Sequence, residues 1–452
     1  MIDSEKHDSS IPVPTMDSRG KRKWLYPDRR SGANSRKRKL TAFALIAIYL
    51  VTPWIQFQGR PLFRIDVLEK KAYFFGLVMR VNEANILAII LATFAIILLL
   101  ATLVKGRIWC SFGCPQTVFV DWVIRPIEEL IEGSAHHRRR IDRESWTFQT
   151  WTKKIFKHIL FFGVAFIVSN AFLAYFIAPD KLLHWMIQPP SEHPVPFLFM
   201  TAVLFVFYGD LAWFREQFCA YLCPYARFQS VMIDQDTPTV SYDAARGEPR
   251  GRGDKKGDCI DCQLCVRVCP TGIDIRQGLQ LECVMCARCI DACNLVMTNV
   301  KKPTGLIRLA SQNELLGSRV TPVWKRPKVI AYTIAIGILL SIGIMRTFGR
   351  STLAINVIRA PGASFSTLPD QRHGNMFILQ IANNSDSDLH LSIQPQTKGL
   401  ELLCAECNSI IKKHGEIRIS AIAAFDAGLS NSVATLKEAT SSQTFELPLI
   451  GP

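Results

Sequence analysis

Residues 258–297 read DCIDCQLCVRVCPTGIDIRQGLQLECVMCARCIDACNLVM and contain eight of the 14 cysteines of the chain. The eight cysteines form two runs with the same C-x2-C-x2-C-x3-C spacing. Bacterial ferredoxins use this spacing to bind [4Fe–4S] clusters. The first run is Cys259, Cys262, Cys265 and Cys269, and the second is Cys283, Cys286, Cys289 and Cys293. The stretch therefore predicts an α+β ferredoxin domain with two [4Fe–4S] clusters over about residues 250–310.

The ligand sets of the two clusters follow from the same spacing. In two-cluster ferredoxins the fourth cysteine of each run binds the other cluster. One cluster is therefore expected to take Cys259, Cys262, Cys265 and Cys293, and the other Cys283, Cys286, Cys289 and Cys269. Zinc is an alternative, but zinc sites favour C-x2-C pairs over triplets. A disulfide scaffold is another, but it needs an oxidising compartment.

The length and charge of the chain narrow the class of protein. Its 452 residues allow two or three domains, and its net charge of +15 gives a pI of about 9.3. The basic residues crowd beside apolar segments, which indicates membrane orientation rather than nucleic-acid binding. No dinucleotide fingerprint or phosphate loop is present. We therefore expect electrons to come from a separate cytoplasmic donor, which the sequence does not identify.

Apolar stretches of spanning length predict a mostly α-helical membrane protein with about five transmembrane helices. Residues 1–39 are polar and basic, and predict a disordered cytoplasmic tail without a cleavable signal peptide. Four helices are expected within residues 40–214, and the fifth at 329–346. The five apolar stretches are about 40–57, 86–104, 158–178, 196–214 and 329–345.

Lys and Arg residues predict the orientation in a bacterial inner membrane. The tail and the loop 105–154 are rich in both, so both are expected in the cytoplasm. The loop 179–195 holds only Lys181 and is expected outside. The loop 60–84 is also basic, and we interpret it as an interfacial hairpin on the outside. Five crossings then place residues 215–328 in the cytoplasm and residues 347–452 in the periplasm.

Two matched C-x3-C-P motifs follow the second and fourth predicted spans. They contain Cys110 and Cys114, and Cys219 and Cys223. Both motifs reach the same cytoplasmic face, and residues four apart share one side of a helix. We predict that these cysteines carry the chemistry, as copper ligands, as redox thiols or as an electron relay; four thiolates suit Cu(I). The adjacent basic loop favours a lowered thiol pKa.

Two further features stand apart from the motifs. Asp210 is an ionisable residue at the inner end of the fourth span, where it serves the site or contacts headgroups.

Residues 347–452 alternate short apolar segments with turn residues, and about seven strands predict an all-β immunoglobulin-like sandwich. Cys404 and Cys407 form a C-x2-C pair there. A local disulfide is favoured, with a copper handover site and free thiols as alternatives.

The cysteine-rich segments resemble a known family. The segments PTGIDIRQGLQLEC, ARCIDAC and PTGLIR are similar to the membrane-bound polyferredoxins called FixG, RdxA or CcoG. So are RIWCSFGCPQTVF at 107–119 and REQFCAYLCPYARFQSVMIDQDTPTVSYDAARGEPRG at 215–251. The resemblance covers about residues 40–450. It implies the same sandwich domain and a role as accessory protein of cbb(3)-type cytochrome c oxidase.

The resemblance also implies an activity, reduction of Cu(II) to Cu(I) for the oxidase copper centre. Copper chaperones or a copper transporter and oxidase assembly factors would be its partners, with no nucleic acid. One alternative is a quinol-linked ferredoxin that serves another respiratory enzyme, because such relatives share the C-x3-C-P motifs. SYDAARGEPRG and the sandwich domain favour the oxidase group. A second alternative is a non-catalytic assembly scaffold with structural clusters.

Overall fold

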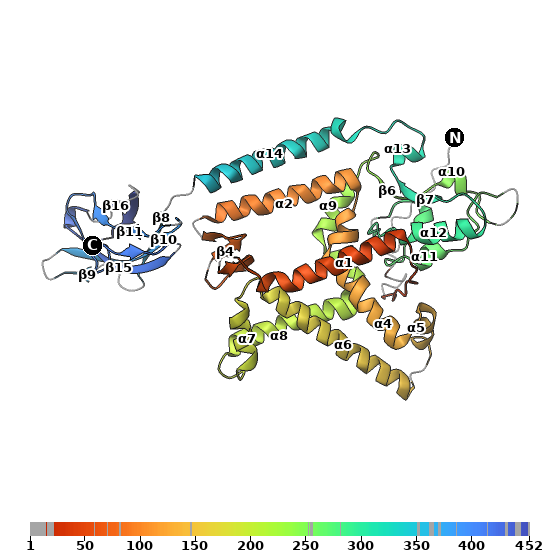
Figure 1. Cartoon of the computed structure of the whole chain (residues 1–452), viewed down its shortest axis with the longest axis horizontal. Helices are drawn as coiled ribbons and strands as arrows, with labels where there is room; N and C mark the ends of the chain where they lie inside the picture. Colours follow the sequence, from red (N-terminus) through yellow and green to blue (C-terminus); the bar gives the residue numbers. More distant parts are fainter. Residues whose placement is uncertain are drawn as a thin grey trace. The chain divides into compact units, whose positions relative to one another are not determined.

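The computed structural model shows a mostly helical protein with several small β-sheets (Figure 1). The chain forms two compact units, Met1–Ser341 and Ile342–Pro452. The structure describes residue 15 and residues 22–57, 59–69, 71–80, 83–144, 147–251, 253, 256–280, 282–349, 353–360, 366–368, 372–385, 387–413, 415–429, 433–438 and 444–450.

Four helices of the described residues are long and apolar enough to cross a membrane. They are α2 (Ala84–Lys105), α6 (Phe148–Leu173), α8 (Pro194–Gly209) with its continuation η5 (Asp210–Phe214), and α14 (Pro327–Phe348). The second, fourth and fifth predicted spans differ from these bounds by three residues or fewer. Helix α6 begins ten residues before the predicted third span, so the polar loop after α2 ends at residue 147.

The N-terminal segment differs from the sequence prediction. Helix α1 (Ala33–Val51) begins inside the predicted disordered tail, and η1 (Thr52–Trp54) continues it. Residues 22–32 also make contacts: Asp28 N–H donates to the Arg267 carbonyl, and Arg29 pairs with Glu129. The prediction of disorder is therefore wrong for residues 22–39, because partners far along the chain hold them. Apart from Thr15, residues 1–21 lie outside the described residues.

A carboxylate from a distant helix caps the N-terminus of α1. Asp291 in α12 (Arg288–Asn299) accepts hydrogen bonds from the backbone N–H groups of Asn34 and Ser35, at 3.3 and 3.0 Å. A Cβ on Gly32 would lie 2.3 Å from the Asp291 side chain, so this close approach requires glycine. Free N–H groups and the helix dipole both favour an anion at this position.

Replacement of Asp291 by Ala should weaken the attachment of α12 to α1. We expect a loss of about 1 kcal/mol, as for other helix N-caps. The measurement is the rate at which a protease cleaves residues 22–32 in detergent-solubilised protein, which should rise. Asp291→Asn keeps an acceptor oxygen and is the matched control. Equal cleavage of the Ala variant and the parent would contradict the capping role.

Short β-strands connect α1 to α2, as the predicted hairpin at 60–84 requires. Strands β3 (Phe63–Asp66), β4 (Lys71–Phe74) and β5 (Leu77–Arg80) form an antiparallel sheet, and β1 (Gln56–Phe57) pairs with β2 (Arg60–Pro61). Ile65 N–H donates to the Tyr175 carbonyl just after α6. The loop between α6 and α8 contains α7 (Pro179–Ile187).

The cysteine-rich region folds around one small sheet and several short helices. Strand β6 (Thr239–Tyr242) pairs antiparallel with β7 (Ile307–Ala310), and between them lie α10 (Ala244–Gly247), α11 (Leu264–Arg267), η7 (Ile275–Gln277) and α12. Their buried core includes Val240, Ile273, Ile290 and Leu306 together with several cysteines. Because β6 belongs to this core, the domain begins at residue 239 rather than near 250. Helix α13 (Gln312–Leu315) and η8 (Val323–Lys325) lead to α14.

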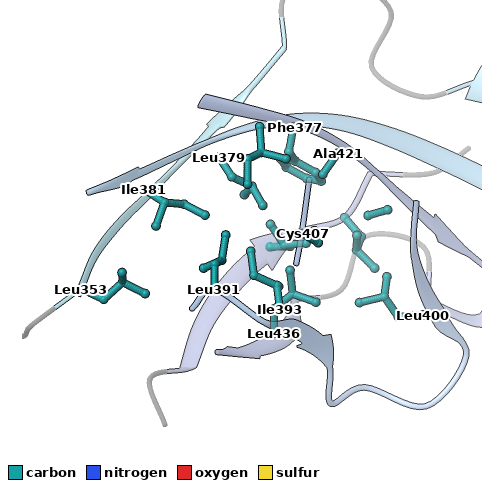
Figure 2. Close-up of a cluster of buried hydrophobic side chains, with 14 of the residues drawn as sticks. Leu353, Phe377, Leu379, Ile381, Leu391, Ile393, Leu400, Cys407, Ala421 and Leu436 are labelled. Carbon is teal, nitrogen blue, oxygen red and sulfur yellow. The ribbon is translucent and has the colours of Figure 1, made fainter. Parts of the chain in front are cut away.

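The second unit is built from antiparallel sheets. A five-stranded sheet has the order β13-β15-β10-β8, with β9 also paired to β10, and smaller sheets have the orders β12-β16-β17 and β11-β14. Strands of the three sheets share one apolar core, in which Phe377, Leu379 and Leu436 converge (Figure 2). The strands are β8 (Leu353–Arg359), β9 (Ser366–Thr367), β10 (His373–Asn383), β11 (Leu389–His390), β12 (Ile393–Pro395), β13 (Leu400–Leu403), β14 (Ile410–Ile411), β15 (Glu416–Phe425), β16 (Val433–Glu438) and β17 (Thr444–Pro448).

Cys404 and Cys407 form a disulfide in this unit. The bond closes the segment between β13 and β14. Cys407 is buried in the core and is drawn at its centre in Figure 2. The favoured sequence prediction for this pair, a local disulfide, is therefore confirmed.

Candidate metal and electron-transfer site

The two cysteine loops have the same backbone conformation. Asp261 and Gln263 in the first loop have φ of 54°, and Met285 and Ala287 at the matching positions have φ of 54° and 58°. Non-glycine residues adopt this left-handed conformation uncommonly. Each loop ends in a helix whose second residue is the third cysteine of its run. The left-handed residues bend each loop around a point of its own, as wrapping of a cluster by three cysteines requires.

The fold brings the cysteines together across the two runs. A small cavity is lined by Cys265 and Cys269 of the first run and by three cysteines of the second. We call Cys269, Cys283, Cys286 and Cys289 the inner quartet, and their cavity the inner cavity. Electrostatic interactions link the other four, since Cys265 interacts with Cys262 and Cys293, and Cys293 with Cys259. We call Cys259, Cys262, Cys265 and Cys293 the outer quartet.

This donor set fits [4Fe–4S] clusters. Each quartet takes three cysteines from one run and one from the other, which is the crossed arrangement of two-cluster ferredoxins. Among the described residues, no three His, Cys, Asp or Glu side chains converge as they would on a single metal ion. A four-iron cluster does not need such convergence, because each thiolate binds a different iron atom. Burial raises the pKa of Cys265 and Cys283 to about 12, so iron binding must displace their protons.

Each C-x3-C-P motif forms one π-helical turn rather than the predicted α-helical turn. The turns are η3 (Trp109–Gly113) and η6 (Phe218–Leu222). The N–H of Cys114 donates to the Trp109 carbonyl at 2.8 Å, and that of Cys223 to the Phe218 carbonyl at 2.9 Å. The following prolines open α3 (Pro115–Phe119) and α9 (Pro224–Met232). Single π turns in helical proteins occur frequently at functional sites.

The four motif cysteines lie close enough for their charges to interact. Cys110 interacts with Cys114 and Cys223, and Cys219 interacts with all three others. We call this group the thiol site. None of the four is fully exposed. The structure thus brings together two motifs that are about a hundred residues apart in the sequence.

The predicted lowering of the thiol pKa is wrong. Burial raises the pKa of Cys110 to about 12 and raises the pKa of Cys219 well above its usual range. Burial also raises the pKa of Cys114, although backbone N–H groups of Gln116 and Thr117 oppose the shift. Several basic residues of the loop 105–154 pair with carboxylates, and burial outweighs the charge of Arg107, which opposes the shift at Cys110. The thiols of Cys110, Cys114 and Cys219 are therefore protonated at neutral pH, and a soft metal ion would have to displace their protons.

Two glutamines, the buried Gln229 and the half-buried Gln116, lie beside the thiol site and were not predicted from the sequence. The Cys110 thiol donates to Gln229 Oε1 at 3.1 Å, and Gln229 Nε2 donates to Thr102 Oγ1 at 3.2 Å. Gln116 Nε2 donates to Asp210 Oδ1 and to the Arg215 carbonyl, both at 3.1 Å. Asp210 therefore contacts the residue that directly follows the first motif. The sequence signal was weak, since glutamines in the helix after each motif are ordinarily solvent-exposed.

A buried carboxylate joins three parts of the first unit. Asp121, in the π turn η4 (Val120–Ile124), accepts from Arg38 of α1 and from Arg125, both at 2.9 Å. Arg288 of α12 lies 3.4 Å from the same carboxylate. Burial alone would raise the pKa of Asp121, but the three guanidinium groups hold it far below its usual range. Arg38 also donates to the carbonyl of Ser111, between Cys110 and Cys114.

Further ion pairs extend from Asp121 along the loop 105–154. Helix α4 (Arg125–Glu132) places Glu128 within 2.8 Å of both Arg138 and Arg215, and Glu132 within 2.7 Å of Lys157. The helix α5 (Ala135–Ile141) carries Arg138. These contacts neutralise several cations of the basic loop, so the burial of the cysteines decides the direction of their pKa.

Family models describe the cysteine-bearing segments in iron–sulfur terms. A model for a 4Fe–4S dicluster domain matches residues 214–256 and 250–312. A model for a 4Fe–4S binding domain matches residues 87–142 and again residues 192–234. Each of the latter matches contains one apolar helix and one C-x3-C-P motif, which indicates an internal repeat.

Similarity to curated proteins identifies the family of this chain. Protein RdxA of Cereibacter sphaeroides is 34% identical over 384 residues, which is 80% of each chain. The chain belongs to the FixG/RdxA family. Nitrogen fixation protein FixG of Rhizobium meliloti is 32% identical over 80% of this chain and 77% of its own. Protein RdxB of Cereibacter sphaeroides is 33% identical over 83% and 84%. This FixG/RdxA family member is an iron–sulfur electron-transfer protein of the membrane.

A second cavity in this FixG/RdxA protein lies between the thiol site and the ferredoxin domain. We call it the connecting cavity. One side is formed by Cys219 and the other by Pro270 and Thr271, which directly follow Cys269. Its remaining lining residues are Gln116, Thr117, Val120, Asp121, Arg125, Arg215, Glu216 and Val284.

Proposed function

We propose that this protein is a cupric reductase that supplies Cu(I) for the copper centre of a cbb(3)-type cytochrome c oxidase. The observation that carries the proposal is the meeting of two C-x3-C-P motifs at one thiol site, beside a cavity that borders the ferredoxin domain. Thiolates select Cu(I) over harder ions. Membership of the FixG/RdxA family, and its resemblance to oxidase accessory proteins, supports the choice of acceptor.

The chemistry needs one electron for each copper ion. A cytoplasmic donor protein loses the electron, Cu(II) gains it, and no bond of the chain breaks. Bound [4Fe–4S] clusters supply transfer of single electrons. The chain itself supplies the copper ligands at the thiol site, whose thiols release protons when the metal binds. Copper chaperones or a transporter would deliver or take up copper, and oxidase assembly factors would receive it.

The direct test is anaerobic reduction of the purified protein, removal of excess reductant and addition of Cu(II) with a Cu(I)-specific chelator. The coloured Cu(I) complex should form as the reduced clusters are reoxidised, one Cu(I) for each electron lost. Clusters that stay reduced would refute cupric reduction. The scaffold alternative is tested separately with Cys262→Ser combined with Cys286→Ser. Normal oxidase assembly with this variant would favour a scaffold.

The cofactor content is a separate prediction. Two quartets imply two [4Fe–4S] clusters. Anaerobically purified protein should contain about eight iron atoms and about eight acid-labile sulfides per chain. Iron and sulfide analysis, with zinc measured in the same samples, checks the prediction. Stoichiometric zinc without iron would contradict it.

We further propose that α1 is a fifth membrane span, although it is not among the four long apolar helices. Its first turn contacts Asp291 of the ferredoxin domain. Its far end contacts the far end of α6, where the Tyr49 hydroxyl donates to the Val168 carbonyl at 2.9 Å. Helix α1 therefore runs through the same layer as α6. Exposed apolar side chains suited to lipid follow its basic start: Leu40, Phe43, Ile48 and Val51.

Five spans support a bacterial inner-membrane protein with a cytoplasmic N-terminus and a periplasmic C-terminal unit. The shared core and antiparallel sheets of Ile342–Pro452 support an immunoglobulin-like sandwich for that unit. Reporter fusions after residues 130 and 300 should report a cytoplasmic location, and a fusion after residue 400 a periplasmic one. A cytoplasmic signal at residue 400 would remove one span from the topology.

A further inference from the structure

The two quartets differ in exposure to solvent. Cys262 of the outer quartet is exposed, and so are its neighbours Asp261 and Gln263. Each quartet has two buried cysteines, and the remaining ones other than Cys262 are half-buried, so the inner quartet has no exposed cysteine. Electron transfer weakens steeply with distance, so a donor protein that arrives from solvent meets the outer quartet first.

The inner quartet shares a wall with the thiol site. Pro270, Thr271 and Val284 line both the inner cavity and the connecting cavity, which reaches Cys219. Thr271 is almost fully buried, and its hydroxyl oxygen lies 3.4 Å from the Cys269 sulfur. When that sulfur is a thiolate, the hydroxyl must be the donor of this hydrogen bond.

Arg107 makes a second connection between the inner quartet and the first C-x3-C-P motif. It lies three residues before Cys110. Its backbone N–H donates to Met285 Sδ at 3.0 Å, and its Nη1 donates to the Cys283 carbonyl at 3.3 Å. Its charge acts on the thiols of both Cys110 and Cys283. The inner quartet is thus held against the thiol site from two directions.

We propose that the two quartets act in a fixed order, with the outer quartet facing the electron donor and the inner quartet facing the thiol site. Thr271 is a positioning residue between the inner quartet and the thiol site. Its hydroxyl stabilises the charge on the Cys269 sulfur. A one-electron donor protein, of the reduced iron–sulfur or flavin class, loses one electron and the final acceptor gains it. Only the identity of that acceptor as Cu(II) rests on the proposed function.

Electron paramagnetic resonance without copper tests whether the outer quartet is the one nearer to solvent. Dithionite-reduced protein is mixed with a dysprosium chelate, which speeds the relaxation of paramagnetic centres near solvent. Cys262→Ser and Cys286→Ser identify which signal belongs to which quartet. We expect the chelate to accelerate the signal altered by Cys262→Ser at least several-fold more than the other. Equal acceleration of both signals, or the reverse, would overturn the order.

The role of Thr271 is tested by redox titration of Thr271→Val, which removes the hydroxyl but keeps the side-chain size. Hydrogen bonds to ligand sulfurs raise the potential of an iron–sulfur cluster. We expect the cluster identified by Cys286→Ser to become about tenfold harder to reduce, or ~59 mV for one electron. The other cluster should be unchanged. Thr298→Val is the matched control, since that exposed hydroxyl contacts only the Asn294 carbonyl among the described residues.

The results of these experiments can refute the order of the quartets without refuting the proposed function, and the reverse also holds. A shift of the outer cluster alone, or of neither cluster, in Thr271→Val would refute the role of Thr271. Both measurements are made without copper, so a failure of Cu(II) reduction leaves them unaffected. Conversely, reduction of Cu(II) with equal exposure of both clusters would support the proposed function and refute the order.

Discussion

Replacement of both Cys110 and Cys219 by serine should abolish reoxidation of the reduced clusters by Cu(II). The variant removes one sulfur from each C-x3-C-P motif, and serine oxygen is a poor ligand for Cu(I). The hydroxyl at position 110 can still donate to Gln229 Oε1, so the local fold should survive. The eight ferredoxin cysteines are untouched. We therefore expect an unchanged iron content and optical spectrum, with a reoxidation rate reduced at least tenfold.

The measurement is stopped-flow absorbance of dithionite-reduced protein mixed anaerobically with Cu(II). Cys404→Ser with Cys407→Ser is the matched control, because it also removes two cysteines but lies in the second unit. Cys286→Ser should show the opposite pattern, with a cluster lost and Cu(I) binding retained. If the Cys110/Cys219 variant reoxidises at the parental rate, these cysteines are not the copper site. Copper would then react at the clusters or elsewhere.

Replacement of Asp121 by leucine should be the most destabilising single change in the first unit. Arg38, Arg125 and Arg288 share this carboxylate, and the side chains of Asp121 and all three arginines are at most 4% exposed. Removal of one partner from a buried ion pair costs about 3–5 kcal/mol, because an uncompensated charge stays buried. Here three cations lose their common partner. We expect a loss of stability of at least that size.

Thermal unfolding in detergent, followed by cluster absorbance, measures the effect. Asp121→Asn keeps the shape and one acceptor oxygen, and should fall between the parent and the leucine variant. Glu144→Gln is the control for a surface pair, since Arg140 and Glu144 are 59% and 63% exposed and 3.6 Å apart. Exposed pairs contribute roughly 0–1 kcal/mol. Equal stability of Asp121→Leu and Glu144→Gln would contradict the role of Asp121.

Local spacing predicted the chemistry of the cysteine-rich segments. The C-x2-C-x2-C-x3-C runs predicted ligand loops that each wrap a point of their own, and the repeated left-handed residues form such loops. Long apolar runs predicted α2, α8 with its continuation η5, and α14 to within three residues. These features depend on neighbours in the chain, because a continuous run of about 20 apolar residues is enough to span a bilayer.

Long-range contacts decided what the sequence pattern did not predict. Arg38 and Asp121 are 83 residues apart, and no periodicity links them. Burial of Cys110 and Cys219 raised their pKa, against the expectation from the basic loop. Several cations of that region are paired with Glu128, Glu132 and other carboxylates, and the charge of Arg107 does not outweigh burial.

Local spacing and long-range packing determine different features of this protein, for a physical reason. The sequence by itself determined which residues can bind iron, span a membrane or bend a loop, because these depend on side-chain type and local spacing. The tertiary structure alone decided that Thr271 contacts Cys269 while facing the cavity of Cys219, and that Asp291 caps α1. Those arrangements depend on which surfaces pack together, and the free energy of packing is summed over contacts far apart in the chain.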